Sequence, residues 1–339
     1  MGLPRRQLGS TDMQITAVGL GAWALGGSGW AYSWGAQDDS QSIRTIRHAL
    51  DLGINWIDTA AIYGLGHSEE VVGRAIKDMP AAQRPLLFTK CGRRLEEKAG
   101  RLGDPVSDLR PQAIRRECEQ SLRRLGTEAI DLYQFHWPDQ TGPPVEESWA
   151  EMVRLLEEGK VRAIGVCNFG THLLDRCEAV RHVDSLQPPF SMINRDMASG
   201  LLPWCLEHNT GVIVYSPMQA GLLTGTFSAE RVARLADDDW RKRAEHFVEP
   251  QLSRNVRLAA ALKPVAERHS STVAAVAVAW TLNWSGVTAA IVGGRSPEQV
   301  DGWIGAGELR LSDQDLDDLA GAMELSGAGS GPFRPASKL

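Results

Sequence analysis

The sequence predicts a single α/β domain over residues 1–339 with the fold of a (β/α)8 TIM barrel. Three observations lead to this prediction. Short apolar segments, typical of buried strands, alternate with amphipathic helical segments about eight times. The length of 339 residues suits such a barrel. No linker rich in Gly, Pro or Ser divides the chain in its middle.

The first expected element is a short hairpin within residues 1–16, which turns at Gly9-Ser10. The expected barrel strands come next, and each is short, apolar and rich in residues that favour strands. These strands are 17–21, 54–58, 86–90, 129–136, 161–166, 183–187, 211–215 and 288–292.

The expected helices carry apolar residues three or four positions apart, which places those residues on one face. Gly126 and Gly159 mark the ends of two helices, and Ser296-Pro297-Glu298-Gln299 has the composition of a helix start. The segment 272–284 is apolar almost throughout and is expected to be buried. Helices are expected near 38–52, from Ser68, over 114–125, over 149–156, up to 181, near 199–208, over 272–284 and from Ser296.

Three segments fall outside this alternation. A loop of about twenty residues is expected between the strand 86–90 and the next helix. Residues 226–256 are rich in charged side chains and are expected to form a surface insertion. A C-terminal helix is followed by residues 326–339, which are rich in Gly, Pro and Ser and are expected to be a flexible tail.

The composition narrows the class of protein. The net charge of −6 argues against nucleic acid as the main partner, and no apolar stretch is long enough for a membrane span or a signal peptide. Five scattered cysteines without a Cys-x-x-Cys pair indicate reduced thiols, a cytoplasmic location and no metal site. Ser337-Lys338-Leu339 would direct the protein to peroxisomes only in a eukaryote, whereas the Ala- and Arg-rich composition is more typical of bacteria.

Gly19, Gly21 and Ala24 match the dinucleotide fingerprint Gly-x-Gly-x-x-Ala. That fingerprint requires a helix to begin at once, so that its N-terminus faces the pyrophosphate. A glycine-rich and aromatic loop over residues 26–34 follows instead. A Rossmann fold is therefore not expected.

Four polar residues follow three consecutive predicted strands. Asp58 ends the first strand and Tyr63 lies in the loop after it, while Lys90 ends the second strand and His136 the third. Because strand ends meet at the mouth of a parallel barrel, these side chains are expected to converge there. Taken singly, each has an ordinary structural interpretation, such as a capped loop, a packed ring, a salt bridge or a core histidine.

Together these four groups suit the reduction of a carbonyl. A tyrosine has a pKa of about 10 and is a weak acid at neutral pH, but a nearby ammonium group lowers that pKa. Tyr63 is therefore expected to protonate the developing alkoxide, with Lys90 lowering its pKa. Asp58 would hold Lys90, and His136 would orient the carbonyl oxygen.

In order and spacing, Asp58, Tyr63, Lys90 and His136 resemble the catalytic tetrad of the aldo-keto reductase superfamily, and the resemblance covers nearly the whole chain. Residues 165–169, Gly-Val-Cys-Asn-Phe, are similar to the family's Gly-Val-Ser-Asn-Phe, with Cys167 in place of serine. The resemblance implies that Asn168 and Gln187 hold the nicotinamide amide. It also implies that the segments 215–217 and 221–225 stack on nicotinamide and cover the pyrophosphate.

Residues 291–299 are similar to the adenosine-phosphate loop of the family's bacterial branch, which includes general stress reductases and NADP-dependent glycerol dehydrogenases. Trp303 stands where that branch usually has asparagine. The substrate pocket walls that the resemblance implies are Trp23, Trp30, Trp34 and Trp137. The implied cofactor-binding residues are Gly21, Ala22, Trp23, Asp58, Asn168, Gln187, Tyr215, Ser216, Pro217, Gly221, Leu222, Thr224, Gly225, Gly293, Arg295 and Gln299.

A separate physical argument places a phosphate near Arg295. This residue follows the last predicted strand and lies just before a helix start, where barrels often bind phosphate. An arginine there suits the 2′-phosphate of NADPH. The alternative is that Arg295 is an ordinary solvated arginine.

The expected function is NADPH-dependent reduction of aldehydes or ketones, reversible as alcohol oxidation. The expected partner is a small carbonyl or alcohol, and the protein is expected to be a monomer or a weak homo-oligomer. One alternative is a Schiff-base aldolase with Lys90 as nucleophile, which borohydride trapping would reveal. Another is a regulatory subunit like the potassium-channel β subunits, which share the fold and would bind NADPH without turnover.

Overall fold

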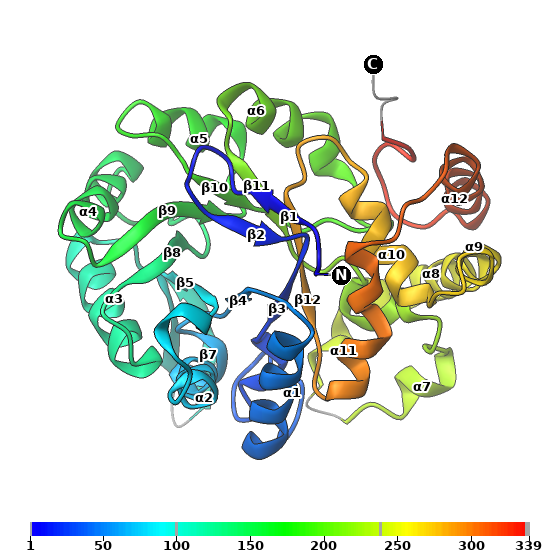
Figure 1. The fold of residues 1–339 in the computed structure, drawn as a ribbon, viewed down its shortest axis with the longest axis horizontal. Coiled ribbons are helices and arrows are strands. Elements are labelled where there is room, and N and C mark those ends of the chain that lie inside the picture. The colour runs from blue at the N-terminus through cyan, green and yellow to red at the C-terminus, as the bar shows by residue number, and fades with distance from the viewer. Residues whose placement is uncertain (1, 99–100, 237–238, 336–339) are drawn as a thin grey trace.

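The computed structural model describes residues 2–98, 101–236 and 239–335, and in this part of the chain eight parallel strands form a closed barrel surrounded by helices (Figure 1). The predicted barrel is confirmed. Its strands follow one another in chain order, and the last pairs with the first to close the ring. The barrel strands are β3 (Val18–Gly21), β4 (Trp56–Asp58), β5 (Leu86–Cys91), β8 (Ile130–Phe135), β9 (Val161–Cys167), β10 (Ser185–Gln187), β11 (Gly211–Val214) and β12 (Ala289–Gly293).

Side chains fill the interior of the barrel in layers. Trp56 is the largest member of an apolar layer, and it fits because a Cβ atom at Gly19 would overlap its indole ring. Asp58, Lys90 and Gln134 lie two residues further along their strands and are also buried. A polar layer therefore covers the apolar layer on the side of the C-terminal mouth. The apolar layer contains Trp56, Phe88, Leu132, Ala163, Ile213 and Ala289.

The expected N-terminal hairpin closes the other end of the barrel. Its strands, β1 (Arg5–Gln7) and β2 (Gln14–Thr16), pair antiparallel. Leu8, Met13 and Ile15 pack into the same apolar cluster as the interior layer. The mouth at the carboxyl ends of the strands is thus the open end of the barrel.

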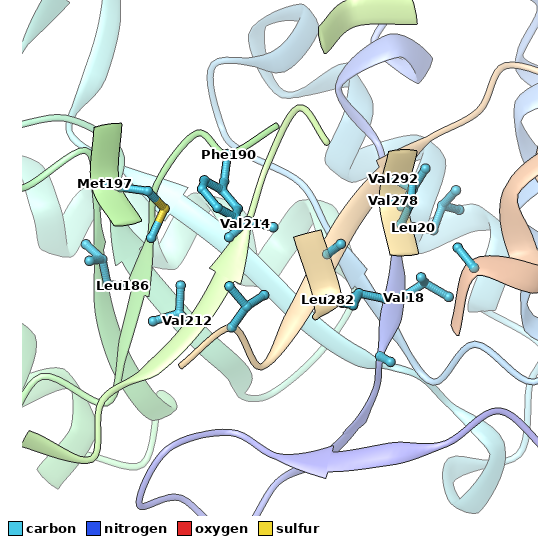
Figure 2. Packing of buried hydrophobic residues seen from close by; sticks show 14 of the residues in the cluster. Val18, Leu20, Leu186, Phe190, Met197, Val212, Val214, Val278, Leu282 and Val292 are labelled. Atoms are coloured by element: carbon cyan, nitrogen blue, oxygen red, sulfur yellow. The ribbon is translucent and has the colours of Figure 1, made fainter. Parts of the chain in front are cut away.

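The outward side chains of the strands pack against the helices. Figure 2 shows part of this contact, where valines and leucines of β3, β11 and β12 lie near Val278 and Leu282 of α10. The helix α10 (Val273–Leu282) is buried from Ala275 to its end, as its apolar sequence predicts. The other helices are α1 (Asp39–Asp51), α2 (His67–Ile76), α3 (Pro111–Leu125), α4 (Val145–Glu157), α5 (Thr171–Glu178), α6 (Leu201–His208), α7 (Ala229–Ala233), α8 (Gln251–Ala261), α9 (Lys263–Arg268), α11 (Pro297–Ile304) and α12 (Asp313–Ser326).

The structure differs from the expected loop after β5. A two-stranded antiparallel ribbon forms there from β6 (Arg93–Lys98) and β7 (Arg101–Ser107). Its sequence lacks the apolar alternation of a half-buried strand, because the ribbon stands apart from the barrel sheet. At its base Gly92 adopts a positive φ, and its N–H group donates to Glu117.

The segment 226–256 is more than a surface insertion. It contains α7, two short 3-10 helices and the start of α8, and Phe227, Val232 and Phe247 are buried. Trp240 lines the main cavity of the barrel mouth. Charged residues separate these buried apolar residues in the sequence, so the segment shows no apolar period that would predict their burial.

The described part of the C-terminal tail packs on the barrel, in contrast to the expected flexible segment. Arg195 is fully buried and donates to the carbonyl oxygens of Met192, Ala328 and Gly331. Its guanidinium also lies 5.0 Å from the centre of the Phe333 ring. These contacts involve residues distant in sequence, so composition alone could not predict them. The Ser337-Lys338-Leu339 motif lies outside the described residues.

Candidate active site

A cavity of about 760 Å³ opens at the C-terminal mouth of the barrel. This volume is typical of small-molecule and cofactor sites. Strand ends and the loops after them supply its lining, as in other enzymes with this fold. Asp58, Tyr63 and His136 line the cavity, and Lys90 is buried beside them.

Lys90 and Asp58 form a buried ion pair on neighbouring strands. The Nζ atom of Lys90 donates to Oδ1 of Asp58 at 2.5 Å and to the carbonyl oxygen of Thr59 at 2.8 Å. Burial lowers the pKa of Lys90, but the charges of Asp58 and Tyr63 outweigh it, so the pKa is raised. Lys90 is therefore a fixed ammonium group.

The second oxygen of Asp58 is also occupied. Nε2 of Gln187 donates to Oδ2 at 2.9 Å, and the same nitrogen lies 3.3 Å from Oε1 of Gln134. Because a carboxylate only accepts, Asp58 determines which way the Gln187 amide faces. The thiol of Cys167 lies 3.7 Å from the same Gln134 oxygen. This side chain is buried and does not line the cavity.

Tyr63 lies over this ion pair, in the turn between β4 and α2. Its ring centre is 5.2 Å from Nζ of Lys90. The turn requires glycine at position 64, since a Cβ atom there would overlap the carbonyl oxygen of Gly26. Burial raises the pKa of Tyr63 to about 12, although Lys90 acts to lower it. Lys90 thus acts on the pKa of Tyr63 in the expected direction, but desolvation outweighs the ammonium charge.

His136 follows β8 and meets Tyr63 edge to face, with ring centres 5.6 Å apart. Its backbone N–H group donates to the carbonyl oxygen of Cys91 at 3.0 Å. Burial, followed by the charges of Lys90 and Arg93, lowers the pKa of His136 well below its usual value. The imidazole is therefore neutral and can offer one donor or one acceptor to a ligand.

Strained backbone is concentrated around this cavity. Asn168, Ser216 and Ala220 all line it, and each has a positive φ although none is glycine. Asn168 is fixed on both sides of its amide: Nδ2 donates to the carbonyl oxygen of His136 at 3.0 Å, and Oδ1 accepts from the Tyr215 hydroxyl at 2.8 Å. Such strain is typical of ligand-binding sites.

Arg295 lies at the other end of the same cavity and is not a free surface residue. Its Nε, Nη1 and Nη2 atoms donate to Gln37 Oε1, the Trp34 carbonyl oxygen and the Ala36 carbonyl oxygen. The backbone N–H group of Arg295 donates to Oε1 of Gln299 at 2.9 Å. Arg295 thus ties the start of α11 to the aromatic loop near Trp34.

The four expected pocket tryptophans all line the cavity, and Trp240 and Trp303, which were not predicted as pocket walls, line it too. Trp240 stacks on Trp23 at 5.4 Å between ring centres, and Trp23 stacks on Tyr63 at 6.1 Å. Trp34 meets both Trp23 and Trp240 edge to face. A single aromatic residue in a charged run was the signal that could have revealed Trp240.

Most of the expected cofactor-binding residues reach the cavity. Leu222 is instead buried in the hydrophobic core. Ala22 and Gly225 lie next to lining residues without lining the cavity themselves. Arg93, Phe227, Arg231 and Arg241 also line it, although they were not predicted. The expected residues that line it are Gly21, Trp23, Asp58, Asn168, Gln187, Tyr215, Ser216, Pro217, Gly221, Thr224, Gly293, Arg295 and Gln299.

Two features are absent from the part of the chain that the structure describes. No helix among the described residues is long and apolar enough to cross a membrane. No group of three or more His, Cys, Asp or Glu side chains in this part of the chain could hold a metal ion.

Comparison with known proteins identifies the family. The model of the aldo/keto reductase family matches residues 17–324. The chain is 36% identical to the aldo-keto reductase YhdN of Bacillus subtilis, over 94% of this chain and 92% of that protein. It is also 36% identical to the NADH-specific methylglyoxal reductase of Escherichia coli, over 94% of this chain and 98% of that protein.

Solved structures agree with this result. The glycerol dehydrogenase AKR11B4 of Gluconobacter oxydans superposes with a TM-score of 0.86 at 35% identity, and all of both chains is covered. The holo form of the aldo-keto reductase AKR11C1 of Bacillus halodurans gives a TM-score of 0.75 at 25% identity, over 94% of this chain and 96% of that one. The chain therefore belongs to the aldo/keto reductase family of oxidoreductases.

Proposed function

We propose that this protein reduces aldehydes or ketones with NADPH, and that Tyr63 is the proton donor. The observation that carries this proposal is the convergence of three groups at one cavity: a protonated phenol and a neutral imidazole line it, and a fixed ammonium is buried beside them. These groups can bind a carbonyl oxygen and stabilise the negative charge that reduction places on it.

A reduced nicotinamide, when bound, supplies the hydride that adds to the carbonyl carbon. As the C=O π electrons move to oxygen, the Tyr63 hydroxyl gives its proton to that oxygen. The ammonium of Lys90, held by Asp58, stabilises the phenolate that results. The neutral imidazole of His136 donates a hydrogen bond to the same oxygen and orients it. The product is an alcohol, and the reverse sequence oxidises an alcohol.

The cavity has suitable groups for a nicotinamide dinucleotide along its length. Gln187 and Asn168 lie near the ion pair and would hold the carboxamide. Tyr215 would stack on the nicotinamide ring, and the strained segment from Ser216 would cover the pyrophosphate. Arg295 would bind the 2′-phosphate of NADPH beside the α11 N-terminus.

The names of the relatives suggest the substrate class. One relative is a methylglyoxal reductase and another is a glycerol dehydrogenase, and both names describe small, polar carbonyls or alcohols. We propose a substrate of this class for the present chain. We also propose that the protein is cytoplasmic and acts as a monomer or a weak homo-oligomer.

The aldolase alternative is not favoured by the geometry. A Schiff base requires a neutral amine, whereas Lys90 is held as an ammonium by Asp58 and has a raised pKa. The regulatory alternative would require nucleotide binding without turnover, and nothing in the cavity favours it over catalysis.

A nucleotide titration tests the proposal. NADPH and NADH are titrated against tryptophan fluorescence, with wild type and Arg295→Ala. We expect wild type to bind NADPH at least about tenfold more tightly than NADH, because the phosphate gains charge-assisted hydrogen bonds. The Arg295→Ala variant should lose this preference and keep its affinity for NADH. Tighter binding of NADH by wild type would refute the NADPH assignment, and no binding of either nucleotide would refute the reductase assignment.

A further inference from the structure

We propose that Arg241 is a second ligand for the 2′-phosphate of NADPH and acts together with Arg295. This inference rests on the proposed function. Arg241 belongs to the 3-10 helix Trp240–Arg243 within the segment that the sequence analysis assigned to the surface. The structure instead places its side chain on the wall of the same cavity that Arg295 lines.

One tryptophan brings the two arginines together. Nη1 of Arg295 donates to the carbonyl oxygen of Trp34 at 2.9 Å. The guanidinium of Arg241 lies over the indole ring of the same residue, 4.6 Å from its centre, and 5.5 Å from the ring centre of Phe227. Cation–π contacts of this kind hold a guanidinium in a fixed position. Two segments far apart in sequence therefore present their cations at one end of the cavity.

Within the described residues, one carboxylate faces two guanidinium groups at this end of the cavity. Asp239 is the carboxylate that pairs with Arg241, through Nε at 3.0 Å and Nη2 at 2.6 Å. Asp239 is 5% exposed and does not line the cavity. In the part of the chain that the structure describes, Arg241 and Arg295 thus share this carboxylate, which lies outside the cavity lining. Burial and then the charge of Arg241 lower the pKa of Arg295, which shows that the two cations oppose each other.

An anion in front of the two arginines would relieve this opposition. The Nε and Nη2 atoms of Arg241 donate to Asp239, whereas its Nη1 atom has no hydrogen-bond acceptor within the described residues. A phosphate group is the anion that a guanidinium binds best, since its oxygens match the N–H geometry. The proximity of Arg295 and the α11 start assigns this phosphate to the adenosine end of the dinucleotide.

Arg231 provides a matched control. It is an arginine of the same segment and lines the same cavity. However, its Nη1 atom donates to the carbonyl and hydroxyl oxygens of Thr226, and its guanidinium stacks on Phe227 at 4.6 Å. Burial, and then the charges of Arg241 and Asp239, shift the pKa of Arg295.

The test compares two fragments that differ in the 2′-phosphate. The fragments 2′,5′-ADP and 5′-AMP are titrated by calorimetry into wild type, Arg241→Met and Arg231→Met, with circular dichroism to check folding. We expect Arg241→Met to weaken 2′,5′-ADP binding at least about tenfold and 5′-AMP binding less than about twofold. Arg231→Met should change neither affinity by more than about twofold.

Three results would contradict the inference in different ways. Unchanged affinities for both fragments in Arg241→Met would overturn it, as would an equal loss for both fragments, which would place Arg241 at the 5′-phosphate. If Arg231→Met weakened 2′,5′-ADP binding as much as Arg241→Met does, the effect would come from general positive charge in the cavity. That result would also overturn the inference. Failure of wild type to bind either fragment would refute the proposed function, which the other results leave intact.

Discussion

Tyr63 retains its proton at neutral pH because of where the chain places it. Burial raises its pKa to about 12, even though Lys90 lies beneath the ring. In the mechanism that we propose, Lys90 therefore stabilises the phenolate after proton transfer and does not make Tyr63 a strong acid. Asp58 keeps Lys90 charged, and Gln187 occupies the remaining oxygen of Asp58. Gln187 thus positions Asp58, and Asp58 positions Lys90 beneath the Tyr63 ring.

Replacing Tyr63 by Phe removes the proton donor and keeps the ring. We expect turnover of any carbonyl substrate to fall by about 10²- to 10⁴-fold, the usual contribution of a general acid. The affinity for NADPH should change less than about twofold, because the ring and its neighbours remain. Steady-state kinetics and fluorescence titration measure the two effects. Tyr32→Phe is the control, since Tyr32 lines the same cavity. Full activity of Tyr63→Phe would contradict the assignment.

The sequence predicts which of these residues converge and that Asp58 holds Lys90, but it does not predict the contact of Gln187 with Asp58. Asp58, Lys90 and His136 lie at or next to the carboxyl ends of neighbouring barrel strands, so barrel geometry alone brings them to one mouth. The contact of Gln187 with Asp58 crosses the barrel between strands distant in sequence. The net pKa of Tyr63 depends on burial, which no sequence pattern reports.

Among the helices and strands, too, some could be predicted from the sequence and others could not. The barrel strands and most helices show the apolar period that packing requires, so their order could be predicted. The β6–β7 ribbon and the segment 226–256 show no such period. The segment 226–256 packs through a few buried apolar residues, among them Phe227 and Phe247, and the charged residues between them hide this pattern in the sequence.

The base of the β6–β7 ribbon contains a carboxyl group with a shifted pKa. Burial raises the pKa of Glu117 on α3 to about 7, although the Gly92 N–H group donates to it at 3.0 Å. Because this pKa is above the unfolded value, the folded protein holds the proton over a range where the unfolded chain has released it. Stability therefore falls as pH rises from about 4.5 to about 7.

Replacing Glu117 by Gln keeps an acceptor for Gly92 and removes the charge. We expect the variant to unfold at a higher urea concentration than wild type at about pH 8, with little difference at about pH 5. Urea unfolding at both values measures the effect. Glu119→Gln on the same helix is the control, because its carboxylate is more exposed and contacts Lys160 at 3.4 Å. An equal difference at both pH values would contradict the role of ionisation.

The two ends of the described chain both contribute to the barrel. The N-terminal hairpin covers the closed end, and residues 328–333 pack on Arg195, whose burial lowers its pKa to about 10. The free energy of unfolding falls when a buried guanidinium loses its hydrogen-bond partners. It also falls when buried carbonyl groups lose their donor. The tail is thus part of the folded structure through these contacts.

Replacing Arg195 by Ala leaves three carbonyl groups without their donor. We expect the free energy of unfolding to fall by about 3 kcal/mol, and residues 328–331 to become accessible to protease. Arg334→Ala is the control, since Arg334 pairs on the surface with Asp313 and Asp317 and should cost less than about 1 kcal/mol. Chemical denaturation and limited proteolysis measure both effects. Equal stability of the two variants would show that Arg195 does not anchor the tail.

The tryptophans at the mouth also bear on how selectivity can change. Trp23 follows β3, Trp34 belongs to the next loop, and Trp240 comes from the segment 226–256, yet each touches the other two. Substitutions at residues in contact do not add independently. A new substrate preference would therefore arise through matched changes in two or three segments, each altering the effect of the others. The evolutionary history of this pocket should accordingly be one of correlated substitutions across distant parts of the sequence.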